Sequence, residues 1–135
     1  LSTQDALRMA GFLTEDGEDV IEELKNGRTG ISYGTCMGSM DAIGDLAKMV
    51  ETGDSSHLNS QTYIKAMPQT SACNLSVYYQ IRGRMIITDT ACTSGSQGIG
   101  YGYEAIADGR QDIMICGGSE ELSAPDAAIF DTANR

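Results

Sequence analysis

The sequence feature that most restricts the possible folds is a pair of short apolar runs, separated by a segment whose apolar residues have helical spacing. The run Met85–Thr88 is rich in β-branched residues, and residues 113–116 are uninterruptedly apolar, as in strands buried on both faces. Between them Ile99 and Tyr103 stand at helical spacing, until Gly109 ends the helix. Strand, helix and strand in this order predict a parallel sheet covered by helices, which is the α/β class.

The first half of the chain continues the same alternation. Residues 30–33 predict a short strand that ends at Gly34, and residues 41–50 predict an amphipathic helix. Residues 51–60 are polar and typical of a surface loop, whereas residues 71–80 fit a buried helix.

The length of 135 residues is sufficient for one core of moderate size. We expect residues 1–25 to form a peripheral helical segment and residues 26–135 to form the core of one incomplete domain. The chain does not begin with Met, and residues 130–135 lack a closing element of their own. We therefore expect an internal piece of a longer protein.

Charge and cysteine usage exclude several classes of function. The net charge of −10 disfavours nucleic acid and anionic membrane surfaces as partners. No apolar run approaches the roughly 20 residues that span a bilayer, and no signal peptide is visible, which predicts a soluble cytoplasmic protein. Cys36, Cys73, Cys92 and Cys116 form no CxxC pair, and the one histidine, His57, lies in the predicted loop. Neither a metal site nor a disulfide framework is indicated.

Cys92 lies where the second predicted strand turns into the following helix. Unpaired N–H groups and the positive end of the helix dipole favour a thiolate at such a turn. The same N–H groups, notably that of Cys92 itself, suit an oxyanion formed by attack on a thioester. The small neighbours Ala91, Ser94 and Gly95 leave room for a substrate carbonyl. The alternative is a buried structural cysteine, which suits the other three cysteines better.

Two motifs carry a resemblance to a known family. The run TACTSGSQGIGYGYEAI at residues 90–106, followed by GRQDIMICGGSEEL at residues 109–122, resembles β-ketoacyl-acyl-carrier-protein synthases of types I and II. YGTCMGSMD at residues 33–41 and YIKAMPQTSACN at residues 63–74 extend the resemblance. It implies a thiolase-like fold of three α-β-α layers, of which this chain would be part of the N-terminal βαβαβ half.

The resemblance also implies an acyltransferase activity without a cofactor. Cys92 would take an acyl group from acyl-carrier protein, and decarboxylation of malonyl-carrier protein would release a carbanion that attacks the thioester. Fatty-acid chain elongation is the expected pathway. In the family two histidines and a lysine from the C-terminal half assist decarboxylation, so this fragment alone is expected to be inactive.

Further roles follow from matching positions in the family. Phe130 corresponds to an aromatic residue that lines the acyl pocket, and Met37 corresponds to the position that limits acyl length, which predicts short to medium chains. Met67 corresponds to a residue that reaches across the dimer interface towards the partner's pocket. The strand Met85–Thr88 corresponds to one that pairs with its copy, so a homodimer is expected.

Two positions depart from the family pattern. Residues 54–56 offer Asp and Ser where several members have basic residues for the acidic carrier protein, and Lys65 is the nearest cation. Asp89 precedes the turn where a small or hydroxyl residue is more usual, and its carboxylate opposes thiolate formation unless it is turned away or paired.

Four alternatives remain open at the level of sequence. A condensing domain of polyketide, aryl-polyene or polyunsaturated-lipid assembly would share these motifs. A non-catalytic partner subunit normally lacks the nucleophile, so Cys92 argues against it. A nucleotide-binding unit is disfavoured because Gly98, Gly100 and Gly102 lie inside the predicted helix instead of opening it. A purely structural module would expose apolar faces.

Overall fold

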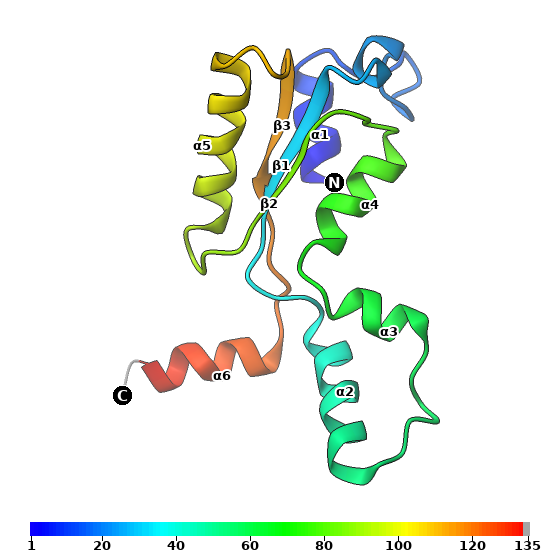
Figure 1. Ribbon diagram of the computed structural model, residues 1–135, viewed down its shortest axis with the longest axis vertical. Coiled ribbons are helices and arrows are strands. Elements are labelled where there is room, and N and C mark those ends of the chain that lie inside the picture. Colours follow the sequence, from blue (N-terminus) through cyan, green and yellow to red (C-terminus); the bar gives the residue numbers. More distant parts are fainter. Residues whose placement is uncertain (134–135) are drawn as a thin grey trace.

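The computed structural model describes residues 1–133, whose helices alternate with three strands (Figure 1). In chain order the elements are α1 (Ser2–Met9), a 3-10 helix (Glu22–Lys25), β1 (Thr29–Gly34), α2 (Met40–Thr52), α3 (Ser60–Lys65), α4 (Thr70–Tyr78), β2 (Met85–Thr88), α5 (Ser94–Ala107), β3 (Ile113–Gly118) and α6 (Ala124–Ala133).

The three strands form one parallel sheet in the order β2-β1-β3. Ile31 of β1 is opposite Met85 of β2 and Ile115 of β3. All of β1 is buried, which confirms the predicted strand and the α/β class. Residues 113–116, predicted to be buried on both faces, are only half-buried because β3 pairs on one side only. The parallel order brings the carboxyl ends of all three strands to one edge of the sheet.

Helices cover both faces of the sheet, which gives three layers (Figure 1). Helix α5 packs along all three strands on one face, and α1 and α4 lie on the other. A Cβ at Gly98 would lie 3.1 Å from the Ser32 carbonyl oxygen, and one at Gly102 would overlap the Cys116 sulfur. These glycines therefore let α5 approach the strands closely, and they do not form a phosphate-binding loop.

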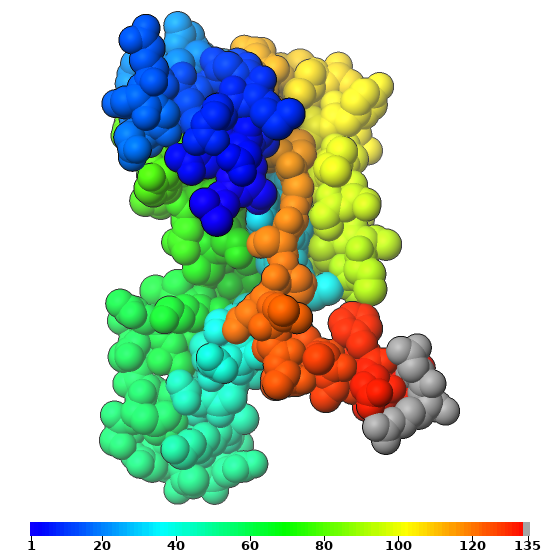
Figure 2. Space-filling view, turned by 180° about the vertical axis from the view of Figure 1, so that it is seen from behind, coloured from blue at the N-terminus to red at the C-terminus, as the bar shows by residue number. Residues whose placement is uncertain are grey.

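The hydrophobic core lies between the sheet and the N-terminal segment. Ile31 and Tyr33 of β1 pack there against Leu7, Val20 and Leu24, all less than a tenth exposed. Residues 1–25, expected to be peripheral, thus supply three core side chains, and Figure 2 shows this segment in blue across the upper part of one face. Because short polar turns separate these three residues in the sequence, no periodic pattern of apolar residues indicates that they are buried.

Helices α2, α3 and α6 lie beyond the carboxyl edge of the sheet (Figures 1 and 2). The predicted loop at residues 51–60 is shorter in the structure, because α2 continues to Thr52 and α3 begins at Ser60. Asn59 forms a capping box at the start of α3: its side chain accepts from the Gln61 and Thr62 amides, and the Thr62 hydroxyl accepts from the Asn59 amide. Among residues 1–133 no helix is long and apolar enough to cross a membrane.

Candidate active site

Cys92 lies in the turn that joins β2 to α5. Of the four cysteines it alone is exposed. The preceding residue, Ala91, has a φ of 51°, a left-handed conformation that is rare for a residue with a Cβ. The turn is therefore sharp, and it presents the Cys92 side chain at the surface two residues before α5 begins.

The buried side chain of Ser94 fixes this turn. Its Oγ accepts a hydrogen bond from the Thr90 amide at 2.9 Å and donates to the Ala91 carbonyl oxygen at 2.6 Å. Its own carbonyl oxygen accepts from the Thr88 hydroxyl at 2.7 Å. The hydrogen bonds of Ser94 thus connect the end of β2, the left-handed residue and the first turn of α5 on both sides of Cys92.

Replacing Ser94 by alanine is therefore expected to loosen the turn. The Thr90 amide and the Ala91 carbonyl would lose a partner, at a cost of about 1–3 kcal/mol in the free energy of unfolding. We expect chemical denaturation of the complete protein to show this loss, together with a slower reaction of Cys92 with iodoacetamide. The matched control is Ser96→Ala, because Ser96 is exposed on the same helix. Equal stability and equal alkylation in the two variants would contradict this account.

The ends of the other two strands meet the start of α5. A Cβ at Gly34 would overlap the backbone of Ser94, and a Cβ at Gly118 would lie 3.0 Å from the Gly95 Cα. The Gly34 carbonyl oxygen accepts from the Ser119 amide at 3.2 Å. The segments that follow β1 and β3 therefore leave the sheet next to the turn that carries Cys92.

Two other cysteines lie in surroundings that keep them protonated. Burial raises the pKa of the Cys36 thiol; the hydrogen bond with Ser94 opposes this rise, and the carboxylates of Glu120 and Asp89 add to it. Burial also raises the pKa of the Cys116 thiol. Both are half-buried, in agreement with the structural role that the sequence assigns to them.

The structure brings two of the three predicted pocket residues together. Met37, after β1, and Met67, between α3 and α4, line one cavity of about 210 Å³. Its other walls are mainly polar and include Ser71, Asn74 and Glu121. Phe130 does not line this cavity: it lies on α6 with 62% of its surface exposed. Helix α6 lies beyond the carboxyl edge of the sheet, on the side to which the turn before α5 projects (Figure 1).

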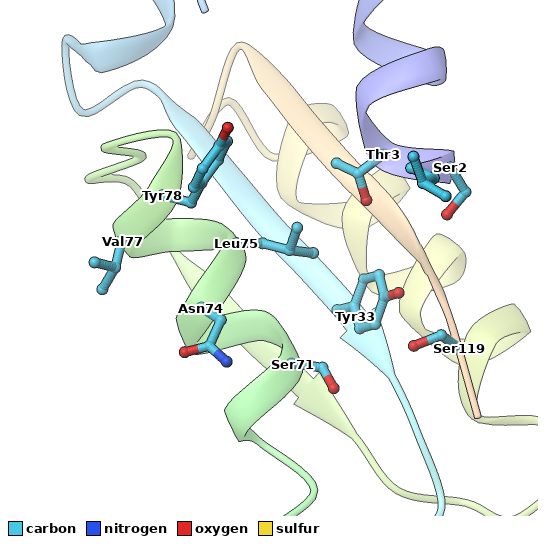
Figure 3. A pocket seen from close by; sticks show the side chains of 10 residues that line it. Ser2, Thr3, Tyr33, Ser71, Asn74, Leu75, Val77, Tyr78 and Ser119 are labelled. Carbon is cyan, nitrogen blue, oxygen red and sulfur yellow. The ribbon is translucent and has the colours of Figure 1, made fainter. Parts of the chain in front are cut away.

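A larger open cavity of about 880 Å³ lies between α1, α4 and β1 (Figure 3). Leu75 and Tyr78 of α4 face it from one side, and Tyr33 of β1 forms its floor. None of its lining residues belongs to the turn at residues 89–93. The same is true of the cavity beside Met37, whose link to the turn runs through the neighbouring Cys36, close to Ser94.

Sequence reasoning missed two carboxylates beside the site. Glu120 and Glu121, after β3, accept hydrogen bonds from the segment that follows β1. Their signal was present in the run GGSEEL, which contributed to the resemblance but was not assigned a function. Asp89 is exposed, and His57 lies in the loop, where its Nε2 is 3.1 Å from the Asp45 carbonyl oxygen.

Comparison with models of known protein families shows to which family the chain belongs. Residues 2–134 match the model of the family described as "Beta-ketoacyl synthase, N-terminal domain". The chain belongs to the β-ketoacyl synthase family. This membership confirms the resemblance, and the parallel sheet between helical layers agrees with the thiolase-like fold of solved β-ketoacyl synthases.

Individual relatives cover the chain well but are much longer. The 3-oxoacyl-[acyl-carrier-protein] synthase 1 of Haemophilus influenzae is 32% identical over 97% of this chain and 31% of its own length. A β-ketoacyl synthase structure from Burkholderia phymatum is 42% identical with a TM-score of 0.87, covering 97% of this chain and 31% of that one.

A second solved structure comes from polyketide synthesis. It is a ketosynthase bound to a hexaketide and in complex with its type II polyketide acyl-carrier protein. It is 31% identical with a TM-score of 0.67, covering 73% of this β-ketoacyl synthase chain and 28% of that one. The chain thus spans under a third of the length of each of these three relatives.

Proposed function

We propose that the complete protein containing this sequence is a decarboxylative condensing enzyme in which Cys92 carries the acyl group. The observation that carries this proposal is the exposed Cys92 in a turn fixed by Ser94, in a chain of the β-ketoacyl synthase family. The other cysteines are at least half-buried. Cys92 is therefore the nucleophile that a carrier-bound thioester can reach.

The proposed reaction has two steps. In the first the Cys92 thiolate attacks the acyl thioester, the bond between the acyl carbon and the carrier sulfur breaks, and the carrier thiolate leaves and takes up the proton that Cys92 had lost. In the second malonyl-carrier protein loses CO₂, and the resulting carbanion attacks the Cys92 thioester, which releases the Cys92 thiolate and the β-ketoacyl-carrier product. The Cys92 N–H, close to the start of α5, is the proposed donor to the oxyanion of each tetrahedral intermediate. We place the groups that assist decarboxylation outside residues 1–135, which alone should not condense.

The proposed partners are an acyl-carrier protein and a second copy of the chain. The polyketide relative is described with its acyl-carrier protein, which supports the first partner. Strand β2 lies at an edge of the sheet, and its residue Met85 is 42% exposed, which supports pairing with another copy. A cytoplasmic location is a further part of the proposal.

We propose fatty-acid elongation as the pathway, with polyketide-type assembly as the second candidate. Relatives from both kinds of assembly resemble the chain. The cavity beside Met37 supports short to medium acyl groups over extended polyketide intermediates by its size of about 210 Å³. Phe130 is proposed to complete the pocket once α6 is covered in the complete protein.

A condensation assay tests this proposal. The complete protein is supplied with malonyl-carrier protein and with butyryl-, octanoyl- or diketide-carrier protein, and CO₂ release and product mass are measured. We expect β-ketoacyl products, with the saturated primers at least about 10-fold better in kcat/KM than the diketide. The reverse preference would support the polyketide candidate. Absence of product from every primer, in a folded protein, would contradict the condensing activity itself.

A further inference from the structure

Glu120 joins the segment after β3 to the segment after β1. Its carboxylate accepts hydrogen bonds from the Cys36 amide at 2.7 Å and from the Thr35 hydroxyl at 3.1 Å, with a longer one from the Met37 amide at 3.4 Å. The two segments are more than 80 residues apart in the sequence. We call this arrangement, Glu120 with residues 35–37, the carboxylate clamp.

The neighbouring Glu121 holds the far end of the same loop. Ser39 precedes α2 but makes no side-chain hydrogen bond to the start of the helix. Instead one carboxylate oxygen of Glu121 accepts from the Met40 amide at 3.1 Å. A carboxylate at a helix start also interacts favourably with the helix dipole. Two successive acidic residues therefore fix both ends of the loop between β1 and α2.

The Glu120 carboxyl of the clamp is ionised at neutral pH. Burial raises the pKa of the Glu120 carboxyl, but the hydrogen bonds from Cys36, Thr35 and Met37 outweigh it and hold this pKa below its usual value. The Cys36 thiol lies near both Glu120 and Ser94, and both affect its pKa. The loop thus lies between Glu120 and the turn that carries Cys92.

The loop also carries Met37, whose side chain lines the cavity of about 210 Å³ together with Met67. The position of Met37 along the loop is set by its own amide and by the two preceding residues, all of which bind Glu120. No other side chain among residues 1–133 is hydrogen-bonded to the Cys36 and Met37 amides. Release of the clamp would remove the Glu120 contacts from residues 35–37 and leave the bond from the Thr35 hydroxyl to the Met37 carbonyl oxygen, at 3.1 Å.

We propose that Glu120 is a positioning residue for acyl-chain selection: it holds the β1–α2 loop so that Met37 closes one end of the acyl pocket. This inference rests on the proposed function, because it assigns a specificity role within the same site. Glu120 does not contact the acyl group. It acts through the backbone of the loop, whereas Met37 would contact the chain directly.

The test measures chain-length preference in the complete protein. Wild type, Glu120→Gln and Glu120→Asp are acylated from butyryl- and dodecanoyl-carrier protein, and the ratio of the two kcat/KM values is determined. Glutamine leaves only one oxygen to accept the hydrogen bonds, so we expect the preference for the short chain to fall about 5- to 10-fold. Aspartate keeps the charge and should restore part of the preference. Glu51→Gln, an exposed residue of α2, is the matched control.

A double-mutant cycle separates positioning from general stability. In a Met37→Gly background the end of the pocket is already open, so Glu120→Gln should change the ratio no further. If Glu120→Gln does not fold, Thr35→Val tests the clamp instead, because it removes the Thr35 hydroxyl, which contacts both Glu120 and the Met37 carbonyl oxygen. An unchanged ratio in a folded, acylating clamp variant would overturn the inference. Failure of the wild type to acylate Cys92 would instead overturn the proposed function.

Discussion

Cys92→Ala in the complete protein is expected to abolish covalent acyl transfer from an acyl-carrier thioester. Alanine has no nucleophile, and the half-buried thiols of Cys36 and Cys116 have pKa values raised by burial, so they remain protonated at neutral pH. We expect condensation to fall by at least about 10³-fold, as for other covalent catalysts that lose their nucleophile. Intact-protein mass spectrometry after exposure to the thioester measures the adduct directly.

The control for this experiment is Cys73→Ala, which removes a half-buried cysteine of α4. It should retain the adduct, and digestion should map the added mass to the peptide that contains Cys92. Cerulenin, a cysteine-directed inhibitor, should modify the same peptide. An adduct that persists in Cys92→Ala would show that another group carries the acyl chain. No adduct in folded wild type would leave a non-catalytic subunit as the better interpretation.

The sequence is sufficient to predict the order of strands and helices in the second half of the chain. Residues 85–88 and 113–116 have the apolar pattern of strands, and Gly109 follows the last turn of α5 in a left-handed conformation with φ of 68°. These signals are local, so periodicity and turn chemistry reveal them. The position of Cys92 between β2 and α5 follows from the same signals.

Features that depend on contacts between distant segments could not be predicted in this way. The hydrogen bonds from residues 35–37 to Glu120 join segments more than 80 residues apart, and nothing in either segment alone specifies the other. Ser94 looks like any small residue at a helix start until its bonds to Thr90 and Ala91 are seen. The role of Leu7, Val20 and Leu24 in the core was missed for the same reason.

Asp89 illustrates a chemical consequence that only the fold reveals. The sequence places its carboxylate three residues before Cys92, where it would oppose a thiolate. In the structure the carboxylate is exposed to solvent, and it contributes to raising the pKa of Cys36. The fold thus shows a physical effect of Asp89 on the neighbouring loop cysteine.

Gly34→Ala is expected to displace the start of α5 and to destabilise the complete protein. The added methyl group would overlap the carbonyl group of Ser94 and lie 2.6 Å from the Gly95 nitrogen, and neither atom can rotate away because both belong to the backbone. Overpacking of this kind costs about 1–3 kcal/mol, and we expect the upper end because Ser94 also holds the turn around Cys92. Chemical denaturation measures the loss in the free energy of unfolding.

Gly44→Ala is the matched control, because a Cβ at Gly44 in α2 meets no atom within 4 Å. There alanine should stabilise the helix by about 0.5–1 kcal/mol, since glycine loses more backbone entropy on folding. The folded fraction of Gly34→Ala should also react more slowly with iodoacetamide at Cys92, because the turn moves with α5. Equal stability of the two variants would mean that β1 and α5 are not in close contact in the complete protein. The close approach of Gly34 to Ser94, and with it the fixed position of Cys92, would then have to be abandoned.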